Sequence, residues 1–173
     1  STMWMDLPIA LRIIATAAAI VQLVSFLYIF QLFTKAKRIL RNNLSSLTKN
    51  LWILVMIAFV IKILLQSLST IPSLSQYAFG FRPVVIGYLH LSFLGIITFL
   101  ILGYINQYLL QQQKQLSANG VYIFVAGVII TEITLMLQGF EAIGFNVLPF
   151  ANIILFIAAI LMATGLLIIT AKK

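Results

Sequence analysis

Long apolar segments alternate with shorter polar stretches along the whole chain. Five segments stand out, covering residues 8–33, 51–68, 84–109, 121–137 and 150–170. A helix that crosses the roughly 30 Å hydrocarbon core of a bilayer needs about 20 residues, so each segment predicts one transmembrane helix. The apolar runs do not alternate residue by residue, which excludes a transmembrane β-barrel. The pattern therefore predicts an all-α, five-helix membrane bundle that forms one domain over residues 1–173.

The composition excludes a water-soluble protein. Hydrophobic residues make up 62% of the chain and charged residues only 8%, whereas soluble domains carry about a quarter of their residues as charges. The chain has no cysteine, which excludes disulfides, thiolate metal sites, iron–sulfur clusters and cysteine nucleophiles. The remaining chemistry depends on a few polar groups within apolar segments.

The basic residues lie mostly on one side of the predicted bundle. That side holds Lys35, Lys37, Arg38, Arg41, Lys49, Lys114, Lys172 and Lys173, whereas the other holds Arg12 and Arg82. Because Lys and Arg in short loops stay cytoplasmic, the N-terminus is predicted outside and the C-terminus in the cytoplasm. Topology and attraction to anionic lipids explain the basic loop, so we expect membrane lipids as partners and no nucleic acid.

The start of the chain does not fit a secretory signal. Residues 1–7 have no basic region and no cleavage motif, and the sequence begins Ser-Thr. We therefore expect a fragment of a larger membrane protein whose upstream helices end outside. The alternative is a short translocated tail with an expression scar.

Two ionisable residues lie deep in separate segments. Lys62 and Glu132 each lie eleven residues from the predicted cytoplasmic end of their segment, at a depth of about 16 Å. Such residues cost about 2.5–3.5 kcal/mol to insert, which makes them functional candidates. Equal depth permits an ion pair, and Gln66 lies one helical turn from Lys62. The pair is either a proton-responsive or anion-handling couple, or simply a neutralised pair with a role in packing.

His90 is the single histidine of the chain and lies about 9 Å from the outer end of segment 84–109. A lone intramembrane histidine either donates a hydrogen bond across a helix interface or ligates haem or a metal through a ring nitrogen. A closed zinc site needs four ligands, and Glu132 is the only other candidate here. A metal site at His90 therefore requires additional helices.

Small residues predict where helices approach each other closely. Segment 84–109 carries Gly87, Gly95 and Gly103, and segment 150–170 carries Ala159 and Ala163. Small side chains let helix backbones approach in a membrane, so we expect helix contacts at these positions.

Two stretches carry a family resemblance, KILLQSLSTIPSL at residues 62–74 and YAFGFRPVVIGYLHLSFLG at residues 77–95. They resemble polytopic membrane proteins from Bacteroidetes that are similar to the NnrS-type, haem-copper-oxidase-like family. The resemblance implies that Lys62, Arg82, Tyr88 and His90 are motif positions, with Tyr88 and His90 at a cofactor site and His90 as the metal ligand. It implies haem or copper only together with the histidine-bearing upstream helices of that family.

Together these observations predict a multi-pass protein of the bacterial inner membrane, NnrS-like, that contributes to a haem, metal or small-ligand site near the outer leaflet. His90 and the Lys62/Glu132 pair form that site, with Tyr88 beside His90 and with Gln66 and Arg82 as supporting polar residues. We do not expect an enzyme that acts alone. The alternatives are a small transporter or channel subunit that uses Lys62 and Glu132, and a structural scaffold. The expected partners are upstream helices of the same protein or further copies of this chain.

Overall fold

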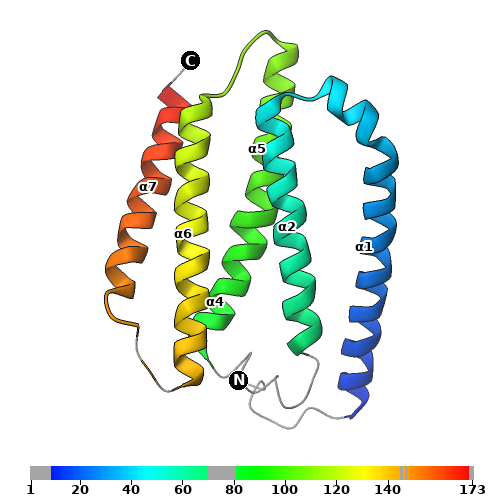
Figure 1. Cartoon of the computed structure of the whole chain (residues 1–173), viewed down its shortest axis with the longest axis vertical. Helices are drawn as coiled ribbons and strands as arrows, with labels where there is room; N and C mark the ends of the chain where they lie inside the picture. Colours follow the sequence, from blue (N-terminus) through cyan, green and yellow to red (C-terminus); the bar gives the residue numbers. More distant parts are fainter. Residues whose placement is uncertain (1–8, 70–80, 145, 147, 172–173) are drawn as a thin grey trace.

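The computed structural model describes residues 9–69, 81–144, 146 and 148–171, and every regular element in these ranges is a helix (Figure 1). The elements are α1 (Ile9–Asn43), α2 (Ser46–Ser69), α4 (Arg82–His90), the π-helix η2 (Leu91–Thr98), α5 (Phe99–Gln111), α6 (Ala118–Ile143) and α7 (Ala151–Ala171). The predicted all-α class is confirmed. Because α4, η2 and α5 follow one another without a break, they form one continuous span of 30 residues, Arg82–Gln111.

Within the described residues, four helices are long and apolar enough to cross a membrane. They are Ser46–Ser69, Arg82–Gln111, Ala118–Ala142 and Ala151–Ala171, and they match four of the five predicted spans. In α1 the apolar stretch is shorter, Thr16–Leu32. The chain therefore has the helices of a multi-pass membrane protein, and the fifth crossing and the direction of all five stay predictions.

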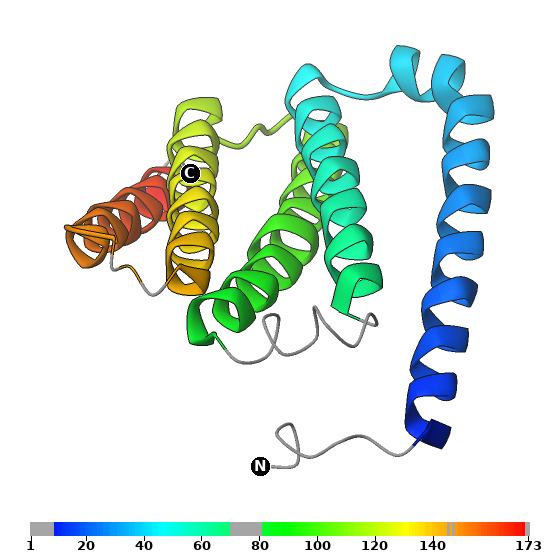
Figure 2. The same ribbon diagram turned by 60° about the horizontal axis from the view of Figure 1, so that its bottom comes forward.

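The basic stretch after the first apolar segment is helical. The sequence predicts a polar connection that begins at Thr34, but α1 continues through Lys35, Lys37, Arg38 and Arg41 to Asn43. The reason is that α1 contains no Gly or Pro, and Lys, Arg, Ala and Leu all favour helix. Figure 2 shows the last turns of α1 bending over toward α2.

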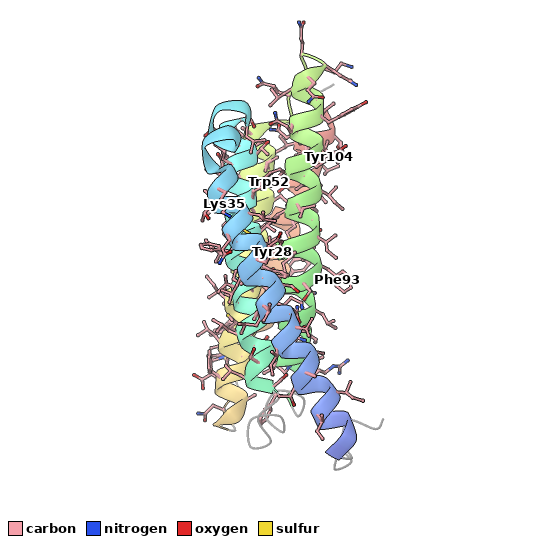
Figure 3. The ribbon with its side chains drawn as sticks, turned by 90° about the vertical axis from the view of Figure 1, so that its right-hand side faces the viewer. Tyr28, Lys35, Trp52, Phe93 and Tyr104 are labelled. Atoms are coloured by element: carbon pink, nitrogen blue, oxygen red, sulfur yellow. The ribbon has the colours of Figure 1, made fainter. Side chains whose placement is uncertain are left out.

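The remaining helices form the bundle, and α1 lies to one side of it (Figures 1 and 2). The rings of Phe26 and Phe59 meet with centroids 5.5 Å apart, which joins α1 to α2. On the Arg82–Gln111 span, the rings of Phe93 and Tyr104 point outward (Figure 3). They are 59% and 65% exposed, as expected for side chains that face lipid.

A buried polar cluster joins the start of α2 to α5. The Asn106 amide donates to the hydroxyl oxygens of Ser45 (2.9 Å) and Thr48 (3.0 Å), and the Thr48 hydroxyl donates to the Gly103 carbonyl at 3.3 Å. Both Thr48 and Asn106 are buried. Because lipid offers these groups no hydrogen bonds, the cluster fixes where α2 begins along α5.

The predicted glycine contacts of the middle span are confirmed. A methyl group built on Gly87 would lie 3.4 Å from Leu135 of α6, and one on Gly95 would lie 3.3 Å from Ala58 of α2. At Gly103 it would lie 2.6 Å from the indole nitrogen of Trp52. Gly95 and Gly103 therefore allow α2 to approach the span closely, whereas the contact at Gly87 is an ordinary van der Waals contact with α6.

The α6–α7 contact uses different small residues from those predicted. Ala159 and Ala163 are exposed, whereas Ala158 and Gly165 are buried against α6. A methyl group on Gly165 would meet the backbone nitrogen of Phe124 at 2.6 Å. The prediction of Ala159 and Ala163 was wrong because it marked small residues without the seven-residue spacing of Ala151, Ala158 and Gly165, all of which are buried.

Replacing Gly165 with alanine should destabilise the bundle. Alanine favours helix over glycine by about 1 kcal/mol, but the added methyl group would press on backbone atoms that cannot rotate away. We expect a net loss of about 1–3 kcal/mol, measured as a lower unfolding temperature in detergent. Gly144→Ala is the matched control, because Gly144 is exposed and lies outside the helix contact. Equal stability of the two variants would contradict the close α6–α7 contact.

The predicted direction of the helices can be tested with single cysteines, because the chain has none of its own. Lys114 lies between α5 and α6, and Asn146 lies between α6 and α7, at the other end of the bundle. With the N-terminus outside, a membrane-impermeant maleimide applied to whole cells should label Asn146→Cys and spare Lys114→Cys. Labelling of Lys114→Cys without labelling of Asn146→Cys would show that the topology is the opposite of the predicted one.

Candidate functional site

The packing contacts place Lys62 and Glu132 at one level of the bundle. On the α2 side, Ala58 lies against Gly95 and Gln66 contacts Tyr88. On the α6 side, Leu135 lies against Gly87 and the Phe124 ring meets the Phe99 ring with centroids 6.4 Å apart. These antiparallel registers bring both ionisable residues to the level of Leu91, in agreement with the equal depth counted from the sequence.

Lys62 has two partners near it, an amide and an aromatic ring. Its ammonium donates to Oε1 of Gln66 at 3.2 Å and lies 5.5 Å from the centroid of the Tyr88 ring. A cation within about 6 Å of an aromatic face is attracted to it. The Tyr88 hydroxyl donates to the same Gln66 oxygen at 3.5 Å, a long and weak hydrogen bond. The Lys62 charge is therefore held by a polar group and a ring rather than by a carboxylate.

Glu132 lies in a pocket between α2, α4 and α6, which we call the Glu132 pocket. The pocket has a volume of about 190 Å³, and its lining is Leu65, Leu68, Ser69, Pro83, Val84, Gly87, Tyr88, Leu91, Glu132, Leu135, Met136, Gly139 and Phe140. Nearly all of these residues are apolar. Oε1 of Glu132 is buried and has no hydrogen-bond partner. An apolar pocket therefore lies beside a residue with one unsatisfied acceptor.

The structure does not bring the two predicted charges together. In the described part of the chain, the Lys62 ammonium bonds to Gln66, and Glu132 Oε1 bonds to nothing. Tyr88 lies between the two groups, because its ring contacts Lys62 and also lines the Glu132 pocket. A local partner on the same helix has replaced the distant carboxylate that the sequence suggests.

His90 and Arg82 line a second space, between α4, α6 and α7, which we call the Arg82 cavity. Its volume is about 420 Å³. Nδ1 of His90 is buried without a hydrogen-bond partner. His90 and Glu132, which the sequence suggests as parts of one site, therefore line two different cavities.

The described residues around His90 do not form a metal site. The lining of the Arg82 cavity contains no other His, Cys, Asp or Glu. Throughout the described ranges, no three such residues lie together in a way that would hold a metal ion. Nδ1 of His90 has no hydrogen-bond partner, but the cavity lining supplies no second metal ligand.

A π-helical segment follows His90 directly, and no pattern in the sequence predicts it. The segment η2 covers Leu91–Thr98, and the Thr98 hydroxyl donates to the Phe93 carbonyl, five residues earlier, at 2.9 Å. π-helical turns inside α-helices are frequent at functional sites. Along this span, Leu91 is the last residue that lines the Glu132 pocket and His90 is the last that lines the Arg82 cavity, so the π-helical segment begins where both linings end.

Double-mutant cycles should show that Lys62 is coupled to Gln66 and not to Glu132. We expect a coupling free energy of about 0.5–1.5 kcal/mol between Lys62→Met and Gln66→Leu, in the range of hydrogen bonds inside membrane proteins. Between Lys62→Met and Glu132→Gln we expect less than about 0.5 kcal/mol. The measurement is the free energy of unfolding of each single and double variant in detergent. A larger coupling free energy between Lys62 and Glu132 than between Lys62 and Gln66 would contradict this prediction and indicate an ion pair.

Comparisons with known proteins identify no family for this chain, because no family model, curated protein or solved structure matches it. Membership of the NnrS-like group, which the motif around His90 suggests, therefore stays a prediction.

Proposed function

We propose that this chain is a multi-pass membrane protein that binds a small, mostly apolar molecule in the Glu132 pocket, with the Glu132 carboxyl group as its polar anchor. One observation carries the proposal: Glu132 lines an apolar pocket, and its Oε1 is buried without a hydrogen-bond partner. An unpaired buried acceptor costs about 1–3 kcal/mol, and an ionisable residue in a membrane helix costs about 2.5–3.5 kcal/mol. A ligand that donates a hydrogen bond would recover part of this cost.

The pocket defines the chemical class of the ligand. Oε1 accepts a hydrogen bond whether or not the carboxyl group carries a proton, so the ligand needs an N–H or O–H donor. The volume is about 190 Å³. An engineered cavity of about 150 Å³ binds benzene, so one ring or a short branched chain fits here. The ligand class is therefore a lipophilic amine or alcohol of about this size.

The ligand would enter from the lipid phase. Three residues of the lining are exposed, Leu68 by 48%, Met136 by 37% and Phe140 by 70%. Leu68 belongs to α2, and the other two belong to α6. In a bilayer, side chains exposed between two spanning helices face acyl chains. The pocket therefore opens sideways to lipid between α2 and α6.

The functions predicted from the sequence differ in their support. A transport couple of Lys62 and Glu132 requires the two groups to exchange charge, but Lys62 is bonded to Gln66. The unpartnered Nδ1 of His90 supports a role in haem or metal binding. Further helices would have to supply the other ligands. Placement in a bacterial inner membrane rests on the motif and the basic residues alone.

Three fluorinated probes of nearly equal size test the proposal. 4-Fluorobenzylamine and 4-fluorobenzyl alcohol carry a donor, and 4-fluorotoluene carries none. We expect the two donors to bind about three- to tenfold more tightly than 4-fluorotoluene, as one hydrogen bond predicts, measured by fluorine NMR in detergent. In Glu132→Leu this difference should disappear.

The matched control is Glu141→Leu, the same change at another position of α6 that does not line the pocket. It should bind the probes as the unmodified chain does. Equal binding of all three probes to the unmodified chain would refute the proposal. A donor preference that survives in Glu132→Leu would refute it as well.

A further inference from the structure

The Arg82 cavity is a second binding space, distinct from the Glu132 pocket. The two linings have only Pro83 and Leu135 in common. The Arg82 cavity is bounded by α7 instead of α2, and at about 420 Å³ it has about twice the volume. An occupant of one space therefore does not occupy the other.

One end of the Arg82 cavity is polar and positively charged. Arg82 is the first residue of α4, Asn152 is the second residue of α7, and Gln138 lies near the end of α6. All three therefore lie at the same end of the bundle and offer N–H donors. No acidic residue lines the cavity, and Glu141 lies one turn beyond Gln138 outside the lining. This end is complementary to an anion.

The other part of the cavity is an apolar row along α7. Leu155, Ala159 and Met162 follow Asn152 at the spacing of one helix face, and all of them line the cavity. From Asn152 to Met162 the row extends about 15 Å, which is half of a hydrocarbon core of about 30 Å. The cavity thus has a polar mouth at the membrane surface and an apolar wall one leaflet deep.

We propose that the Arg82 cavity binds an anionic phospholipid. The phosphate group lies at Arg82 and accepts hydrogen bonds from the amides of Gln138 and Asn152, and one acyl chain lies along Leu155, Ala159 and Met162. An arginine guanidinium forms charge-assisted hydrogen bonds with phosphate, on whichever side of the membrane it lies. His90 lies about 12 Å deeper than Arg82, beyond the phosphate, so the proposal does not depend on it.

Native mass spectrometry of the full chain in detergent tests the proposal. The probes are phosphatidylglycerol and phosphatidylcholine with the same palmitoyl and oleoyl chains. One basic residue near a membrane surface changes affinity for anionic lipid by about fivefold, so we expect at least this preference for phosphatidylglycerol. Arg82→Gln should reduce the preference to less than about twofold.

Lys114→Gln is the matched control, because it removes one exposed basic residue at the other end of the bundle and should leave the preference unchanged. Ala159→Phe places a bulky side chain in the apolar row, at an exposed position. It should weaken the binding of both lipids while Arg82 stays in place. It decides the outcome if Arg82→Gln fails to fold.

Three results would overturn the proposal. The first is equal binding of the two lipids by the unmodified chain, and the second is a preference that survives in Arg82→Gln. The third is displacement of phosphatidylglycerol by inorganic phosphate together with no effect of Ala159→Phe, which would assign the site to free phosphate instead of a lipid.

Discussion

Close approach of helices at glycine is the constraint on which the polar groups of this bundle depend. Lipid gives apolar helices no hydrophobic reason to associate, so packing of side chains against backbone decides their register. Gly95 and Gly103 set the register of the middle span against α2, and on the other side Gly139 of α6 sets it against Val84 of the span. The buried cluster of Thr48 and Asn106 fixes the same register from the far end. Once both registers are fixed, the depth of every polar side chain in the bundle follows.

Depth could be predicted from the sequence, but pairing could not. Each residue of a helix advances by 1.5 Å, so counting places Lys62 and Glu132 at one level. Which neighbouring helix each residue faces depends on packing. Segments that are almost uniformly apolar do not specify this packing. Gln66 lies four residues from Lys62, a spacing at which two side chains on a helix are always neighbours. The local partner therefore has an advantage over Glu132, whose approach would depend on two interfaces.

The same uniformity explains the other differences between sequence and structure. The π-helical turn of η2 adds one residue to the helix within an almost wholly apolar run. Because few polar residues mark one face of the helix there, the extra residue leaves the pattern of polar and apolar positions unchanged. The α7 segment contains several small residues, and only their seven-residue spacing separates the buried Ala158 and Gly165 from the exposed Ala159 and Ala163. The four spans that the structure confirms as long apolar helices were predictable, because a run of about 20 apolar residues has no other stable arrangement in a bilayer.

The helix α4 is a wall of both cavities, so their shapes are linked. Its nine residues give Gly87 and Tyr88 to the Glu132 pocket and Arg82 and His90 to the Arg82 cavity, and Pro83 borders both. On the α6 side, Val84 lies against Gly139 and Gly87 lies against Leu135, which leaves little room for α4 to approach α6 more closely. Any movement of α4 across α6 must therefore narrow one cavity as it widens the other. Because η2 separates α4 from the tightly packed α5, such a movement would not require the contact of Gly103 with Trp52 to change.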